Sequence, residues 1–108
     1  MISTHILDTH LGQPARQVAI HLFDAQGQLL ATAFTNQDGR VLAADFGLSA
    51  IHCGDYSLEF ATQAYFAQQQ LATFFPKVVI HFTIQDASQH YHIPLLISPF
   101  AYSTYRGS

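Results

Sequence analysis

The sequence predicts an all-β fold, an antiparallel β-sandwich with one short helix. Most of the chain consists of short segments in which apolar and polar residues alternate, the period of a strand with one buried face. Turn-forming pairs such as Asp38-Gly39 and Gly54-Asp55 separate these segments. One segment, residues 62–71, is instead rich in alanine and glutamine. Seven or eight short strands and a single helix favour two packed sheets.

The expected strands follow one another with turns of glycine, proline, asparagine or aspartate between them. In chain order they cover residues 2–8, 17–24, 29–35, 56–61, 78–84 and 90–97, with a last strand that includes 102–105. The helix over 62–71 is expected to begin with Thr62 as its N-cap and to turn Tyr65 or Phe66 inward.

Alternation separates a core face from an outer face in the strand over residues 90–97. The residues of the expected core face are Tyr91, Ile93, Leu95 and Ile97, and those of the outer face are His90, His92, Pro94 and Leu96. In the strand over 78–84, the expected core residues are Val78, Ile80, Phe82 and Ile84.

Composition limits the classes of function. The chain has 108 residues, 49% hydrophobic and only 10% charged, against roughly 25% charged in typical soluble domains. We therefore expect one domain that buries apolar surface in an oligomer. Net charge is −3 and the four cationic side chains are scattered, so neither a nucleic-acid nor a membrane partner is expected. These side chains are Arg16, Arg40, Lys77 and Arg106.

The single cysteine, Cys53, excludes an internal disulfide and is expected to be a small buried side chain. No apolar stretch reaches the ~18 residues of a membrane span. The first residues lack the pattern of a signal peptide, so a cytoplasmic location is the expectation.

The outer faces of three strands carry polar and titratable residues. Ser3 and His5 share a face of the first strand, and Ser103 and Tyr105 share a face of the last. If these faces point the same way as His92, then His5, His92, Ser103 and Tyr105 meet on rigid strands, where a catalytic site could form.

The seven histidines do not all need a function, because a single histidine on a strand usually has a surface or structural role. That interpretation is adequate for His10, His21, His52, His81 and His90. It is weaker for His5 and His92, which alternation places on candidate polar faces. A zinc site of His90, His92 and His5 is an alternative, but no carboxylate accompanies it and no metal is expected. Without further information, we expect Arg40 to be a solvated arginine in a loop.

Three blocks of the sequence together resemble the transthyretin-like proteins, specifically the 5-hydroxyisourate hydrolases. The first is Ile2-Ser3-Thr4-His5-Ile6-Leu7-Asp8 with Gly12-x-Pro14-Ala15. The second is Thr35-Asn36-x-Asp38-Gly39-Arg40, and the third runs from His90 to the ending Tyr105-Arg106-Gly107-Ser108. The terminal segment is highly specific, and the resemblance covers essentially the whole chain.

The resemblance implies a transthyretin-like domain over residues 1–108, with two four-stranded sheets and one short helix, assembled as a dimer of dimers around a central channel. It implies hydrolysis of 5-hydroxyisourate to 2-oxo-4-hydroxy-4-carboxy-5-ureidoimidazoline in urate degradation, without a cofactor. His5, Arg40 and His92 would be catalytic. The residues implied to bind substrate are Ser103, Tyr105, Arg106, Gly107 and Ser108, although the strand parity of Arg106 assigns it mainly to anchoring the tail.

Two other classes of function remain possible from the sequence. A non-catalytic module that binds a small ligand could use the same channel, as the hormone carrier transthyretin does, but that carrier lacks the histidines and the Tyr-Arg-Gly-Ser ending. A histidine-rich metal-binding or structural protein is the third possibility. Activity in saturating EDTA would separate a metal-dependent hydrolase from the mechanism above.

Overall fold

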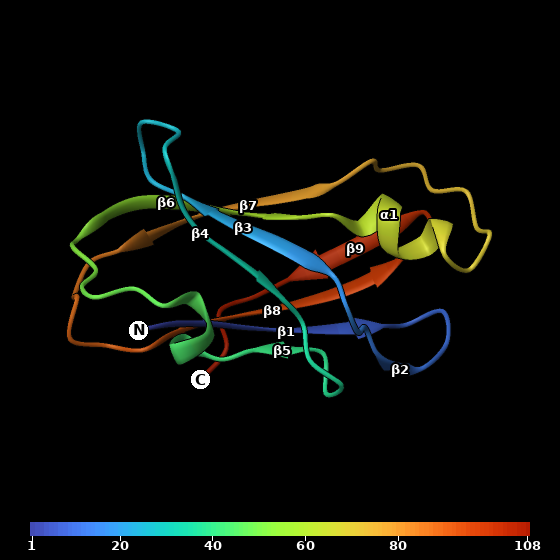
Figure 1. Cartoon of the computed structure of the whole chain (residues 1–108), viewed down its shortest axis with the longest axis horizontal. Helices are drawn as coiled ribbons and strands as arrows, with labels where there is room; N and C mark the ends of the chain where they lie inside the picture. Colours follow the sequence, from blue (N-terminus) through green and yellow to red (C-terminus); the bar gives the residue numbers. More distant parts are fainter.

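Two β-sheets pack face to face, as the computed structural model of all 108 residues shows (Figure 1). The first sheet has the order β2-β1-β8-β9, and β5 pairs with the free part of β1. Its strands are β1 (Ile2–Asp8), β2 (Gln13–Pro14), β5 (Arg40–Val41), β8 (Tyr91–Ser98) and β9 (Ala101–Thr104). The second sheet has the order β4-β3-β6-β7. Its strands are β3 (Ala19–Phe23), β4 (Leu29–Phe34), β6 (Gly54–Phe60) and β7 (Val78–Ile84).

The predicted fold class is therefore confirmed, with two differences of detail. The two-residue strands β2 and β5 bring the total to nine, so the first sheet has five strands where the resemblance implied four. In addition, β1 and β8 pair in parallel, although the sandwich was expected to be antiparallel. A parallel pair needs a long connection between its strands, and here nearly the whole chain lies between them.

One hydrophobic core of 20 buried residues fills the space between the sheets. In β8 the alternation prediction is confirmed, because Tyr91, Ile93, Leu95 and Ile97 are at most 6% exposed. In β7 only the ends of the expected core face, Val78 and Ile84, are buried. The middle residues of that face, Ile80 and Phe82, stay half-buried because β7 is an edge strand with no neighbour on one side.

The helix α1 (Thr62–Ala67) is shorter than the predicted span and begins differently. Ala61 is at the N-cap, so the prediction that Thr62 caps the helix is wrong. Thr62 is buried and its hydroxyl has no hydrogen-bond partner. The helix ends early because Gln70, three residues after Ala67, has a left-handed backbone with φ of 59°. Tyr65 and Phe66 both face inward, as expected. A 3₁₀-helix, η1 (Ala43–Phe46), follows β5.

The prediction of a buried cysteine is also wrong. Cys53 is exposed because it lies in the loop before β6, beyond the end of the packed sheets. Its Sγ lies 3.3 Å from the carbonyl oxygen of Gln85. None of the helices is long and apolar enough to cross a membrane.

A buried carboxylate fixes the end of β1 against the helix. Asp8 is fully buried, and burial of an ionised carboxylate is costly unless hydrogen bonds compensate it. The Tyr65 hydroxyl donates to its Oδ2 at 2.7 Å. Burial, followed by this hydrogen bond, raises the pKa of Tyr65 to about 12. The other donors to the carboxylate are Gln69 Nε2 and the backbone N–H groups of His10 and Leu11. The network holds the loop after β1 and the helix together.

Replacement of Tyr65 by phenylalanine should lower the free energy of unfolding by roughly 1–3 kcal/mol, because it removes a hydrogen bond to a buried charge while keeping the ring. Urea denaturation at fixed protein concentration would measure the change. Tyr102→Phe is the matched control, since the Tyr102 side chain is 42% exposed. Equal midpoints for the two variants would contradict the role given to Tyr65.

Candidate active site

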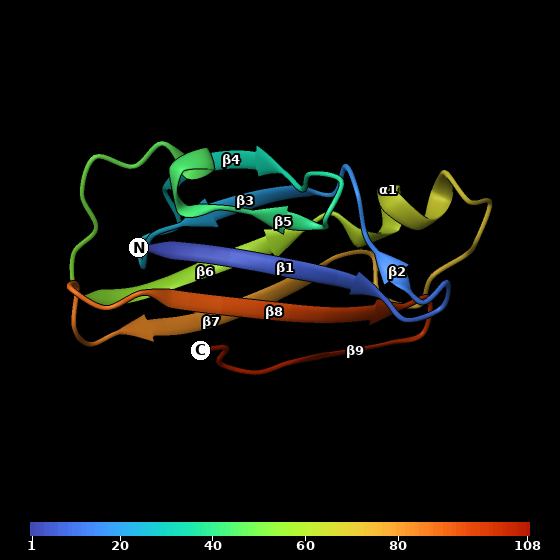
Figure 2. The ribbon, with the colours of Figure 1, turned by 90° about the horizontal axis from the view of Figure 1, so that it is seen from below.

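The parallel pairing of β1 and β8 places polar residues from the two ends of the chain side by side. Ser3 registers with His92, and His5 registers with Pro94. Residues that register across a parallel pair share a face of the sheet, and here it is the outer face, opposite the core. Figure 2 shows β5, β1, β8 and β9 running next to one another.

A tight turn positions Arg40 on the same face. The side-chain oxygen of Asn36 accepts hydrogen bonds from the N–H groups of Asp38 and Arg40, at 2.9 and 3.1 Å. Gly39 has φ of +73°, and a Cβ there would lie 2.5 Å from the carbonyl oxygen of Ile6. Only glycine fits this close approach. The turn leads directly into β5, where Arg40 registers with His5.

The C-terminal tail returns along β8 towards its start (Figure 2). The β8–β9 ladder pairs Leu95 with Thr104, and an isolated bridge in the same register pairs His92 with Gly107. Between them the ladder is interrupted at Pro94, which has no N–H to donate. The N–H of Gly107 donates to the carbonyl oxygen of His92 at 2.9 Å. A Cβ on Gly107 would lie 2.6 Å from His92 Cδ2, so glycine is required for the tail to pass this close.

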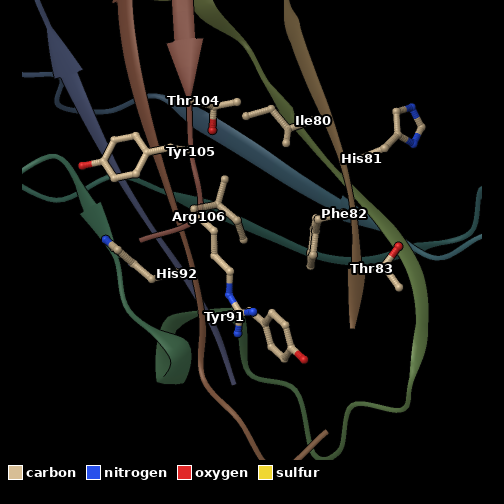
Figure 3. Close-up of a pocket in the computed structure, with 10 residues that line it drawn as sticks. Ile80, His81, Phe82, Thr83, Tyr91, His92, Thr104, Tyr105 and Arg106 are labelled. Carbon is tan, nitrogen blue, oxygen red and sulfur yellow. The ribbon is translucent and has the colours of Figure 1, made fainter. Parts of the chain in front are cut away.

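Arg106 turns away from the outer face. Its guanidinium lies 4.6 Å from the centre of the Tyr91 ring, and its Nη2 donates to Gln89 Oε1 at 3.0 Å. Figure 3 shows this stacked pair on one side of β8, with His92 and Tyr105 on the other side. These contacts fit an anchoring role for Arg106 and leave its neighbours Tyr105 and Gly107 on the outer face.

A cavity of about 330 Å³ lies between edge strand β7 and the tail. Its lining residues include Ile80, Phe82, Tyr91, His92, Tyr105 and Arg106 (Figure 3). Ser3, His5 and Arg40 do not line it. The cavity therefore lies at the edge of the sandwich, and His92 is the residue of the polar cluster that also lines it.

Partial burial and the charge of Arg40 favour the neutral form of both histidines of the cluster. Partial burial is the main cause that lowers the pKa of His5 below 6.5, and the charge of Arg40 adds to it. A backbone hydrogen bond with Asp38 and the charge of Asp38 oppose this shift. Partial burial likewise lowers the pKa of His92, followed by the charges of Arg40, His90 and His5. A neutral imidazole has a ring nitrogen free to accept a proton.

The structure brings together most of the residues selected from the sequence, but not all. His5, Arg40, His92 and Gly107 form the cluster. Ser103 shares the outer face and is exposed opposite Leu96, further along β8. The side chain of Tyr105 is 61% exposed, and Ser108 is exposed next to Gly107.

Sequence reasoning missed two members of the cluster. Ser3 Oγ lies 2.7 Å from His90 Nε2 and 2.8 Å from His92 Nδ1. From the sequence alone, His90 is expected to have only a surface or structural role, although the His-x-His spacing puts it on the same face as His92. The zinc alternative has no ligand set, because no three histidine, cysteine, aspartate or glutamate side chains are arranged to hold a metal ion.

Comparison with known proteins identifies the family. The profile of the HIUase/Transthyretin family matches residues 2–107. The chain therefore belongs to the HIUase/Transthyretin family. It is 42% identical over 111 residues to the 5-hydroxyisourate hydrolase of Salmonella typhimurium, a match that covers 100% of this chain and 81% of that protein.

Two solved structures of this family share the fold. The 5-hydroxyisourate hydrolase of Klebsiella pneumoniae superposes with a TM-score of 0.89 at 41% identity, covering 99% of this chain and 98% of that one. Sea bream transthyretin in complex with thyroxine has the same TM-score of 0.89 at 30% identity, covering 98% of this chain and 93% of that one. The family thus includes both enzymes and a hormone-binding protein.

Removal of the Arg40 charge should raise the pKa values of both His5 and His92, because the guanidinium disfavours the protonated imidazole. An NMR titration of the imidazole resonances in Arg40→Ala would measure both shifts. Arg16→Ala removes an equal charge outside the cluster and should leave both values where they are. Unchanged values in Arg40→Ala would show that the guanidinium is not close to the two rings.

Proposed function

We propose that this chain hydrolyses 5-hydroxyisourate to 2-oxo-4-hydroxy-4-carboxy-5-ureidoimidazoline in urate degradation. The observation that carries the proposal is a pair of histidines with lowered pKa values beside one arginine, on the outer face of the first sheet. Full-length identity of about 40% to enzymes named 5-hydroxyisourate hydrolase supports it.

In the proposed mechanism, His92 and His5 orient a water molecule and remove its proton as it attacks the carbonyl carbon of the ring amide. The lowered pKa values favour this role, since a base must be unprotonated at the working pH. General base catalysis of this kind contributes about 10²–10⁴-fold. The reaction needs neither a cofactor nor a covalent nucleophile.

Arg40 has the role of stabilising negative charge on the ring oxygen as the water adds. Its guanidinium carries fixed donors suited to an oxyanion, and the same charge keeps the two histidines unprotonated. The position of Arg40 opposite His5 supports both tasks.

The tail closes the proposed site. Tyr105, Gly107 and Ser108 contact substrate beside His92, with Ser103 further along the same face, and Arg106 holds the tail through Tyr91 and Gln89. The close packing of Gly107 on the His92 ring supports this arrangement, because it brings the tail next to the proposed base.

The proposed assembly is a homotetramer, a dimer of dimers with the site in a central channel. A single chain leaves large apolar side chains exposed, as the 10% content of charged residues suggested. Exposed examples are Leu29, Phe34, Leu42, Phe74 and Phe100. A cytoplasmic location stays a prediction.

The proposal is tested by the ultraviolet decay of 5-hydroxyisourate, freshly made from urate and urate oxidase. The protein should accelerate the decay, and His92→Asn should lower kcat by about 10²-fold or more because it removes the base. Arg40→Ala should also abolish most of the acceleration. His10→Asn and Arg16→Ala are the matched controls and should keep wild-type rates. Saturating EDTA should have no effect.

If 5-hydroxyisourate decays at its spontaneous rate in the presence of folded, oligomeric protein, the proposed hydrolase activity is refuted. It would favour the second candidate, a module that binds a small ligand, which the thyroxine-bound relative supports. Full activity of His92→Asn would remove His92 from the role of base while leaving the activity in place.

The Gly107→Ala variant should lose at least about tenfold in kcat/KM with little change in melting temperature. The added methyl group must displace either the tail or the His92 ring, and a misplacement of about 1 Å can cost as much as 10²-fold in rate. Gly27→Ala, in a turn where the new Cβ has no neighbour within 4 Å, should keep its activity. Wild-type kcat/KM in Gly107→Ala would contradict the proposed contact.

A further inference from the structure

A buried serine joins two histidines at the proposed site. Ser3 is 5% exposed, and its hydroxyl oxygen lies within hydrogen-bond distance of His90 Nε2 and His92 Nδ1. The parallel register that pairs Ser3 with His92 fixes this geometry on the sheet. His90 is exposed, while His92 is partly buried under the tail. The three residues therefore form a continuous path of hydrogen bonds from the cluster to solvent.

We propose that Ser3 and His90 form a relay that fixes the tautomer of His92 and carries a proton from it to solvent. The proposal rests on the proposed function, in which His92 removes a proton from water. Ser3 and His90 do not touch the substrate in this scheme. They are positioning residues that act through His92.

A hydroxyl group has one proton to donate, which limits the hydrogen bonds that Ser3 can make. When Ser3 donates to His90 Nε2, it must accept from His92 Nδ1. The proton of neutral His92 is then on Nδ1, and its Nε2 keeps a lone pair for the substrate water. Without the hydroxyl, no contact selects which ring nitrogen of His92 carries the proton. A fraction of the enzyme molecules would then hold the proton on Nε2 and lack a base for the substrate water.

Each proton of the reaction can be followed along the same path. His92 Nε2 takes a proton from water while the resulting hydroxide bonds to the carbonyl carbon. The Nδ1 proton of His92 passes to Ser3 Oγ, and the original hydroxyl proton of Ser3 passes to His90 Nε2. His90 becomes an imidazolium that releases its Nδ1 proton to solvent. Ser3 ends as a neutral hydroxyl and His92 as the neutral tautomer protonated on Nε2. When Nε2 gives its proton to the leaving nitrogen, the relay runs in reverse: His90 takes a proton from solvent on Nδ1, its Nε2 proton passes to Ser3, and the Ser3 proton returns to Nδ1 of His92, which restores the starting state.

The charges around His92 favour this transfer. Partial burial is the main cause that disfavours a positive charge on His92, followed by the charges of Arg40 from β5, of His90 and of His5 from β1. Arg106 lies on the opposite face of β8, over Tyr91. Exposed His90 is solvated by water when it is charged. Moving the proton outward therefore relieves the repulsion that a protonated His92 would experience beside Arg40.

The test is the same decay assay on the assembled protein, with Ser3→Ala and His90→Asn. Each should lower kcat roughly 10- to 10³-fold and change KM less than about twofold, because loss of an orienting group acts on the chemical step. Ser3→Thr keeps the hydroxyl and should recover activity. Ser57→Ala and His10→Asn, a serine of the second sheet and an exposed loop histidine, are the controls.

Two further measurements separate a relay from a merely structural role. In the His92→Asn background, Ser3→Ala should cause no additional loss, because both changes act on the same base. Added imidazole should accelerate His90→Asn above the rate of imidazole without protein, and should not accelerate the wild type. An additive loss in the double variant would overturn the relay, as would a failure of imidazole to act.

Failure of the relay and failure of the proposed function give different results. Wild-type kcat in His90→Asn or Ser3→Ala, with His92→Asn inactive, overturns the relay and leaves the hydrolase standing. A wild-type protein that does not accelerate the decay overturns both. Since His90 is exposed, its replacement tests the relay even where a change at buried Ser3 disturbs the fold.

Discussion

The parallel pairing of β1 with β8 is the constraint on which the proposed site depends. It joins residues 89 positions apart in the sequence, Ser3 and His92, and fixes which side chains share the outer face. A shift of one residue would turn His92 towards the core and Tyr91 towards solvent. The core opposes such a shift, since Ile93 and Leu95 of β8, both buried, would become exposed. The packing of the sandwich thus fixes the chemistry of its outer face.

Arg40 places a positive charge on this face. Its position comes from Asn36 and Gly39, which fold a turn that leads into β5 opposite His5. The guanidinium then suppresses protonation of the nearby histidines while it remains available to an oxyanion. In the proposed mechanism, one fixed cation therefore favours the neutral form of both bases and binds the negative charge that forms during hydrolysis. The burial of both histidines is partial, so neither is cut off from a small substrate.

The path of the tail depends on two residues, one without a backbone N–H and one without a side chain. Pro94 interrupts the β8–β9 ladder, and Thr104 Oγ1 donates to its carbonyl oxygen at 2.7 Å. Gly107 then re-forms a single bridge to His92. Arg106, stacked on Tyr91 between these points, fastens the tail from the core side. The ending therefore lies directly against the side chain proposed as base.

The sequence by itself determined the fold class, the core face of β8 and the position of His92 on its outer face. Alternation carries this information, because burial of one face of a strand is a local pattern. Only the tertiary structure decided the parallel pair, the two-residue strands and the N-cap of α1 at Ala61. It also decided the contact of Ser3 with His90, which depends on register between distant strands. No local pattern records which strands become neighbours, since that depends on how the whole core packs.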